Sequence, residues 1–69
     1  MKIEIDKEVD ASYIYAKEEI GEGEVAKTIE VNGNIILDFD SGGKLIGIEI
    51  LDASKNLSNK FLSSVVSAK

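Results

Sequence analysis

The chain contains no cysteine, no histidine and no arginine. Without cysteine it can form no disulfide, no thiolate zinc site and no cysteine nucleophile. Without histidine it lacks the side chain that most often transfers protons near neutral pH. These two absences remove most catalytic constellations, so we expect no enzymatic activity and no bound cofactor.

The charge is unbalanced toward acids, with eight lysines against thirteen carboxylates and a net charge of −5. A nucleic-acid surface needs clustered cations, and base recognition relies on arginine, so we expect no nucleic-acid binding. An acidic surface suits a basic protein partner, although a merely solvated surface would have the same composition.

No segment has the length and hydrophobicity of a membrane span. Residues 1–6 alternate apolar and charged side chains and contain no apolar core of a signal peptide. No later apolar run is long enough to cross a bilayer. We therefore expect a cytoplasmic protein with no membrane association.

The length, 69 residues, predicts a single domain of marginal stability. A chain this short buries only about 60% of the surface that its unfolded form exposes. Disulfides are excluded, so association with a second copy is the simplest way to bury more surface.

Alternation of apolar and polar residues predicts five strands. Turn-forming residues separate most of them, and the glutamate-rich segment 17–24 is the longest loop. The predicted strands are 2–6, 11–16, 25–31, 35–39 and 45–51.

The short loops at 32–34 and 41–43 define the register of two hairpins. The predicted opposing pairs are Val31 with Ile35, Ile29 with Leu37, Leu37 with Gly47, Ile36 with Ile48, and Asp40 with Lys44. This register collects Ile36, Ile46, Ile48 and Ile50 on one face and leaves both faces of the central strands substantially apolar. Each face therefore needs a cover.

The C-terminal segment can cover one face, because its apolar residues recur at helical spacing. They are Leu57, Phe61, Leu62, Val65 and Val66, and the candidate N-caps are Asp52, Ser54 and Ser58. We expect a helix over about 53–67, packed on one face of the sheet. A second copy of the chain would cover the other face.

The predicted fold class is α+β. Residues 1–51 form a five-stranded antiparallel β-meander with the strands side by side in chain order, and the helix follows. The whole chain, 1–69, is one domain that forms a homodimer.

Three carboxylates, Asp38, Asp40 and Glu49, come close together in the second hairpin. They suggest an alternative function, a small carboxylate-based enzyme or a divalent-metal binder. The predicted register places Asp38 and Asp40 on the face opposite Glu49, which favours turn-forming and surface roles. Gly47, in the middle of a strand, indicates a bulge or a close contact.

Tyr13 and Tyr15 point the same way from the second strand. They suit packing in a core or dimer, or insertion into a partner's pocket. The function we expect is a non-enzymatic protein-interaction module, a homodimer whose acidic surface binds another, basic protein. Its candidate contacts are Tyr13, Tyr15, Asp38, Asp40 and Glu49. A dimer that serves only as a structural module is a further alternative.

An ordered set of short motifs resembles the small prokaryotic family known as domain of unknown function 2283. The motifs are residues 1–3 with Asp6, Ala11-x-Tyr13-Ile14, Asp38-x-Asp40, Gly43-x-x-x-Gly47-Ile48-Glu49-Ile50-Leu51 and Asp52-Ala53-Ser54-Lys55. The resemblance covers about residues 1–57 and implies a small β-meander with a C-terminal helix, and no reaction. It also implies a toxin-like small protein as partner. Ser12 and Ala16 stand where the family usually has large apolar residues.

Overall fold

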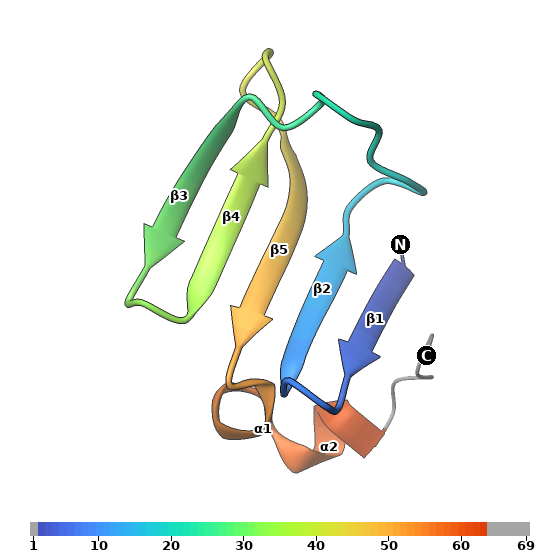
Figure 1. The fold of residues 1–69 in the computed structure, drawn as a ribbon, viewed down its shortest axis with the longest axis vertical. Helices are drawn as coiled ribbons and strands as arrows, with labels where there is room; N and C mark the ends of the chain where they lie inside the picture. The colour runs from blue at the N-terminus through green and yellow to red at the C-terminus, as the bar shows by residue number, and fades with distance from the viewer. Residues whose placement is uncertain (1, 64–69) are drawn as a thin grey trace.

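A five-stranded antiparallel sheet followed by two short helices makes up the computed structural model, which describes residues 2–63 (Figure 1). The predicted α+β class is confirmed. The strands are β1 (Lys2–Asp6), β2 (Ala11–Tyr15), β3 (Lys27–Val31), β4 (Ile35–Phe39) and β5 (Leu45–Leu51), and the helices are α1 (Ala53–Asn56) and α2 (Asn59–Ser63).

The strand order is β1-β2-β5-β4-β3, so the predicted order along the chain is wrong at one place. β5 lies between β2 and β4, whereas a simple meander would place it at an edge (Figure 1). The loop after β2 carries the chain to the far edge, and two hairpins bring it back into the gap. The central place lets the longest apolar strand form hydrogen bonds along both of its edges.

The β3–β4 hairpin has the predicted register, with Val31 opposite Ile35 and Ile29 opposite Leu37. Its turn needs positive backbone angles, and Asn32 (φ 47°) and Gly33 (φ 82°) supply them. Asparagine and glycine adopt these angles at the lowest steric cost, which is why this turn could be located from the sequence.

The β4–β5 hairpin contains a bulge next to Gly47, which the predicted register did not include. Asp38 lies opposite Gly47 while Phe39 lies opposite Leu45, so Ile46 is an extra residue on β5. Asp40 still pairs with Lys44 at the turn, where the Asp40 amide donates to the Lys44 carbonyl over 2.9 Å.

Beyond the bulge the register differs from the prediction by one residue. Leu37 lies opposite Ile48, and Ile36 lies opposite Glu49. A shift of one residue moves every side chain of a strand to the other face of the sheet. The predicted pairs of Leu37 with Gly47 and Ile36 with Ile48 are therefore wrong, and Ile36 is separated from the other isoleucines of that group.

As a result the sheet has one apolar face and one polar face, and the expectation of two substantially apolar faces is wrong. The apolar face carries Ile3, Ile5, Ile14, Ile29, Val31, Ile35, Leu37, Phe39, Ile48 and Ile50. The polar face carries Lys2, Glu4, Asp6, Tyr13, Tyr15, Thr28, Glu30, Asp38 and Glu49, together with a few apolar residues.

The C-terminal helix is divided in two, which corrects the expected single helix over 53–67. Leu57 has extended backbone angles (φ −118°, ψ 143°) and ends α1. Ser58 then caps α2, because its Oγ accepts a hydrogen bond of 3.1 Å from the amide of Phe61. Val65 and Val66, also assigned to the helix, lie outside the described residues. Neither α1 nor α2 has the length and apolar character that a membrane span requires.

α1 is capped by a residue from the other end of the chain. Asp10 accepts hydrogen bonds from the amide (3.0 Å) and the hydroxyl (2.7 Å) of Ser54, and its carbonyl accepts one from the amide of Ala53 (2.8 Å). Asp52 occupies the N-cap position with φ 51° and makes no side-chain capping bond. The turn after β1 therefore anchors the start of α1 to the sheet.

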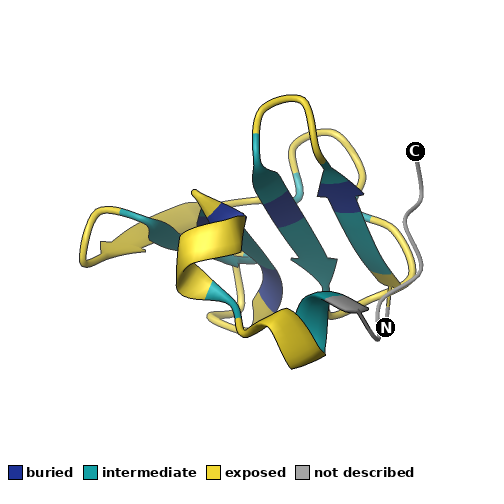
Figure 2. Cartoon of the chain, turned by 90° about the horizontal axis from the view of Figure 1, so that it is seen from below, coloured by how far each residue is buried: buried dark blue, intermediate teal, exposed yellow. Residues whose placement is uncertain are grey.

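Two groups of residues are buried. Ile5, Ser12, Ile50 and Ala53, which are 1–8% exposed, lie where α1 meets the sheet. Ile46, 5% exposed, and Gly47 are buried at the bulge near the start of β5. In Figure 2 the outer strand β3 is exposed along its whole length. The hairpin of β3 and β4 therefore extends the sheet beyond the buried region.

Candidate functional site

The two faces of the sheet present two different candidate surfaces. The polar face is organised around the tyrosines of β2, and the apolar face has an open hollow over β3 and β4. Their residues come from strands far apart in sequence, so each surface depends on the strand order.

Tyr13 on β2 reaches across the central strand β5 to β4. Its hydroxyl donates a hydrogen bond of 2.7 Å to Oδ2 of Asp38. The ring passes directly over Gly47, where an added Cβ would lie 1.9 Å from the hydroxyl oxygen and 2.6 Å from Cζ of Tyr13. The glycine predicted to mark a bulge or a close contact thus marks both, because the bulge at Ile46 is adjacent.

Asp38 extends this connection to the edge strand β3. Its Oδ1 accepts a hydrogen bond of 2.9 Å from the hydroxyl of Thr28. Tyr13, Gly47, Asp38 and Thr28 together form a contact across four strands, which we call the tyrosine–aspartate brace. Both carboxylate oxygens of Asp38 have donors, as a carboxylate in a half-buried position requires.

Tyr15 forms a second, more exposed group next to the brace. Its hydroxyl donates to Oε1 of Glu4 over 2.9 Å, and its ring lies edge-to-face against Tyr13 at 4.7 Å between centroids. Nζ of Lys2 lies 4.5 Å from the centre of the Tyr15 ring and 3.8 Å from Oε2 of Glu4. The ring and the carboxylate together attract this ammonium group.

Both tyrosines are held in the protonated form. Burial, the hydrogen bond to Asp38 and the negative charges nearby raise the pKa of Tyr13 far above its ordinary value of 10.0. The hydrogen bond to Glu4, with a contribution from burial, raises the pKa of Tyr15. The two hydroxyls therefore act as hydrogen-bond donors at neutral pH, and neither is suited to be a base.

The structure places the three predicted carboxylates at two locations. Asp38 and Glu49 share the polar face, with Glu49 opposite Tyr13, so their predicted separation is wrong because of the bulge. Asp40 stays at the turn, where its Oδ1 accepts hydrogen bonds of 2.9 Å from the amides of Gly42 and Lys44. Within residues 2–63 no group of three or more acidic side chains is arranged to hold a metal ion.

A hollow on the polar face collects negative charge. Its volume is about 260 Å³, and its lining residues include Glu4, Asp6, Tyr13 and Glu49. Three carboxylates and one tyrosine ring provide the chemistry that attracts a lysine or arginine side chain.

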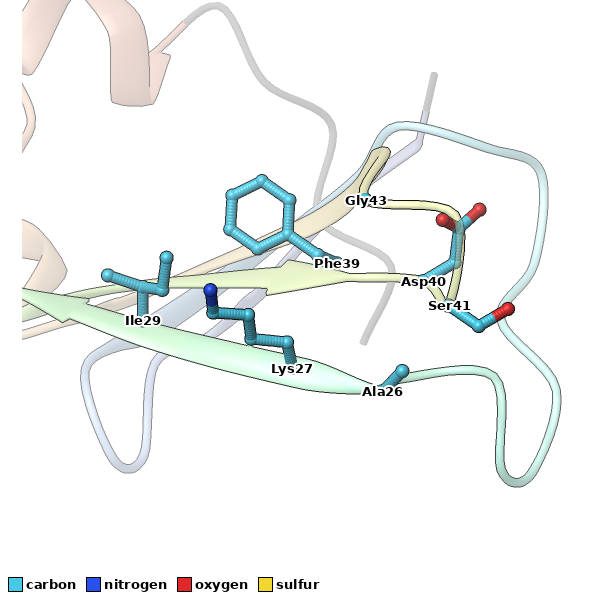
Figure 3. A pocket seen from close by; sticks show the side chains of 7 residues that line it. All are labelled: Ala26, Lys27, Ile29, Phe39, Asp40, Ser41 and Gly43. Atoms are coloured by element: carbon cyan, nitrogen blue, oxygen red, sulfur yellow. The ribbon is translucent and has the colours of Figure 1, made fainter.

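The apolar face has its own hollow of about 400 Å³ over β3 and β4. Lys27, Ile29 and Phe39 project from the same side of the two strands (Figure 3). Ile29 is 39% exposed, and Val31 next to it along the face is 42% exposed. The surface is apolar at Ile29, Val31 and Phe39, and Lys27, Asp40 and Ser41 make its other end polar.

Tyr13, Tyr15 and the three carboxylates were predicted from the sequence, but three other residues of the two surfaces were missed. Nothing in the sequence distinguishes Thr28 from other strand residues. Its hydrogen bond to Asp38 follows only from the β3–β4 register. Lys27 and Phe39 line the hollow on the apolar face, and nothing in their spacing distinguishes them. The glycine at position 47 was the one local indication of the brace.

Searches with this chain match no curated protein and no solved structure. A family model does match, over residues 2–54, and this range contains Tyr13, Asp38 and Gly47 of the brace. The chain therefore belongs to the family described as Protein of unknown function (DUF2283).

Proposed function

We propose that this protein is a non-enzymatic interaction module that forms a homodimer through the apolar face over β3 and β4. The polar face then stays available for a basic protein partner. One observation carries the proposal: the sheet is apolar on one face, and over β3 no layer of described residues covers that face.

The exposure of this surface supports self-association. Ile29 and Val31 are large aliphatic residues that remain about two-fifths exposed in the isolated chain. Burial of apolar surface contributes roughly 25 cal/mol per Å². Among the described residues only three large apolar side chains, Ile5, Ile46 and Ile50, are buried, so burial at a dimer interface would add to a small core.

The opposite face supports a basic partner. Glu4, Asp6, Asp38 and Glu49 lie on it. Among the paired strand residues that the structure describes, Lys2 is the one lysine on this face, and it already contacts Glu4 and the ring of Tyr15. Complementary charge directs association and fixes orientation. The family resemblance suggests a small, toxin-like protein as the natural partner.

The dimer is tested by light scattering on the purified chain over a range of concentrations. We expect the dimer mass for the wild type and the monomer mass for Ile29→Lys, because a lysine on the apolar face opposes burial. Glu30→Lys is the matched control, since it places the same side chain one residue away on the polar face, and it should remain a dimer. A wild-type protein that is monomeric at every concentration would contradict the proposal.

Binding of a basic partner is tested with a ten-residue lysine peptide, using tyrosine fluorescence to measure Kd. Affinity should fall as salt rises, because exposed charges are screened beyond about 10 Å at 0.1 M ionic strength. Glu49→Gln should weaken binding more than Glu22→Gln, which removes the same charge from the distant loop. An affinity that does not depend on salt or on Glu49 argues against this role for the polar face.

A further inference from the structure

The outer edge of β3 is an unoccupied hydrogen-bonding edge. In the described residues no element lies beside it, and all five of its residues are exposed (Figure 1). Its pairing with β4 is regular over all five residues. The other edge strand, β1, is less exposed, because Lys2 is the only exposed residue among its five. A straight, exposed edge is a template for one more strand.

We propose that the added strand is β3 of a second copy, paired antiparallel so that Ile29 lies opposite the partner's Ile29. The two sheets would join into one of ten strands around a twofold axis. This inference rests on the proposed homodimer and specifies how it is built. An antiparallel pair of identical strands satisfies the requirement of a twofold interface that the same surface be used on both sides.

The face of the sheet limits the register. Opposing residues in antiparallel strands point to the same face of the sheet. For the apolar faces of the two copies to join, each apolar-face residue of β3 must therefore lie opposite an apolar-face residue of the partner strand. This excludes every register in which an odd-numbered residue of β3 meets an even-numbered one. In the remaining registers, a residue whose amide and carbonyl point outward always meets another such residue, so the hydrogen bonds can form.

Charge and strand length select among the remaining registers. With Glu30 at the centre, two glutamates would lie directly opposite each other and repel. With Thr28 at the centre, Val31 would have no strand residue opposite it. With Ile29 at the centre, all five residues pair: Ile29 meets Ile29, Thr28 meets Glu30, and Lys27 meets Val31.

The same register makes the two apolar faces continuous. Ile29 of each copy would lie beside the partner's Ile29 and diagonal to the partner's Val31, while Leu37 and Ile35 on β4 flank Ile29 and Val31 on the other side. The aliphatic stem of Lys27 can lie along the partner's Val31 while its ammonium group stays in water. Edge pairing therefore shields the outer side of Ile29 and Val31, the residues whose exposure supports the dimer.

The absence of cysteine makes a direct test simple, because one engineered cysteine is the only thiol in the chain. Directly opposed residues have Cβ atoms about 4.5–5.5 Å apart, which is close to disulfide distance. Ile29→Cys should form a disulfide-linked dimer under mild oxidation, and an equal mixture of Thr28→Cys and Glu30→Cys should form the mixed dimer. The two tests cover both kinds of opposed pair, since hydrogen-bonded and non-hydrogen-bonded pairs alternate along the ladder.

Glu30→Cys alone is the control. Its two thiols would sit diagonally, with Cα atoms about 8 Å apart from the strand rise and spacing, beyond the disulfide limit. We expect cross-linking at least about tenfold slower than in the better of the two opposed pairs, given the steep geometric requirement of a disulfide.

Other arrangements give different results. Sheets stacked face to face lie about 10 Å apart, so neither opposed pair would cross-link although light scattering still reports a dimer. That result would overturn the edge pairing and leave the proposed dimer intact. A monomer by light scattering without cross-linking would overturn both. Faster cross-linking of Glu30→Cys alone than of either opposed pair would also overturn the register.

Discussion

The two sides of this sheet differ in how they are held together. On the helix side, which comprises β1, β2, β5 and α1, Ile5, Ile50 and Ala53 are buried, and Asp10 caps α1. On the hairpin side, which comprises β3 and β4, every residue of β3 is exposed and every residue of β4 is half-buried.

The comparison indicates that burial, more than strand pairing, separates the two sides. Both have complete antiparallel ladders, so their hydrogen bonds do not distinguish them. What differs is the second layer, which the helices provide at one end only. The tyrosine–aspartate brace compensates in part, because it ties β2 on the helix side to Asp38 and Thr28 on the hairpin side.

The largest expected difference comes from the same substitution on the two sides. Ile50→Ala should lower the free energy of unfolding by about 3 kcal/mol, because it leaves a cavity among buried side chains. Ile29→Ala should lower it by only about 0.5 kcal/mol when measured by urea unfolding at concentrations where the protein is monomeric. Equal decreases in the free energy of unfolding for Ile50→Ala and Ile29→Ala would show that burial does not distinguish the two sides of the sheet.

The next largest effect concerns the brace. Gly47→Ala should cost about 2 kcal/mol, because the new Cβ occupies the place of the Tyr13 ring and hydroxyl. In a Tyr13→Ala background the same change should cost much less, since the obstruction is gone. A double-mutant cycle in urea measures this coupling, and additive costs would mean that the contact with Tyr13 does not explain the glycine.

A gain in stability is expected on the helix side. Ser12 is 2% exposed between Ile5 and Ile50, and its hydroxyl has no hydrogen-bond partner among the described residues. Ser12→Ala should raise the free energy of unfolding by about 1 kcal/mol, because an unpaired buried hydroxyl loses its hydration without compensation. Ser41→Ala in the exposed turn is the control and should change little. A lower Tm for Ser12→Ala would indicate that the hydroxyl has an unseen partner.

The smallest expected effect is the loss of stability when Tyr13 of the brace ionises, which has no influence at neutral pH. The pKa of Tyr13 is raised in the folded protein, so the folded state keeps the proton that the unfolded state loses near pH 10. This contribution to stability is complete below pH 10 and is lost as pH rises above it. We expect unfolding midpoints to decline above pH 10 more steeply in the wild type than in Tyr13→Phe. Ultraviolet absorbance should show both tyrosines of the folded protein ionising at a higher pH than free tyrosine.

Much of the fold could be predicted from local patterns. Alternation located all five strands, and the three-residue loop at 32–34 predicted the register of the β3–β4 hairpin correctly. The predicted β4–β5 register was wrong because one extra residue, Ile46, produces a bulge. Gly47 indicated a bulge or a close contact, but it did not show that the pairing would shift by one residue. The division of the helix at Leu57 was also missed, since the apolar spacing continues through it.

The candidate site was predictable in some of its residues, but its arrangement was not. Tyr13, Asp38 and Glu49 were predicted from the sequence as candidate contacts for a partner. Their common face depends on the bulge, and the role of Asp10 as a cap depends on a contact across 44 residues of sequence. Neither follows from spacing along one segment.

The sequence by itself determined the strands, the turns and the absence of thiol, imidazole and guanidinium chemistry, because these follow from each residue and its near neighbours. Only the tertiary structure decided that β5 enters between β2 and β4, that one face is apolar and the other acidic, and that Tyr13 crosses Gly47 to reach Asp38. These outcomes depend on pairing between distant segments. Which pairs form is set by the combined free energy of the whole sheet, to which each strand contributes through all its neighbours.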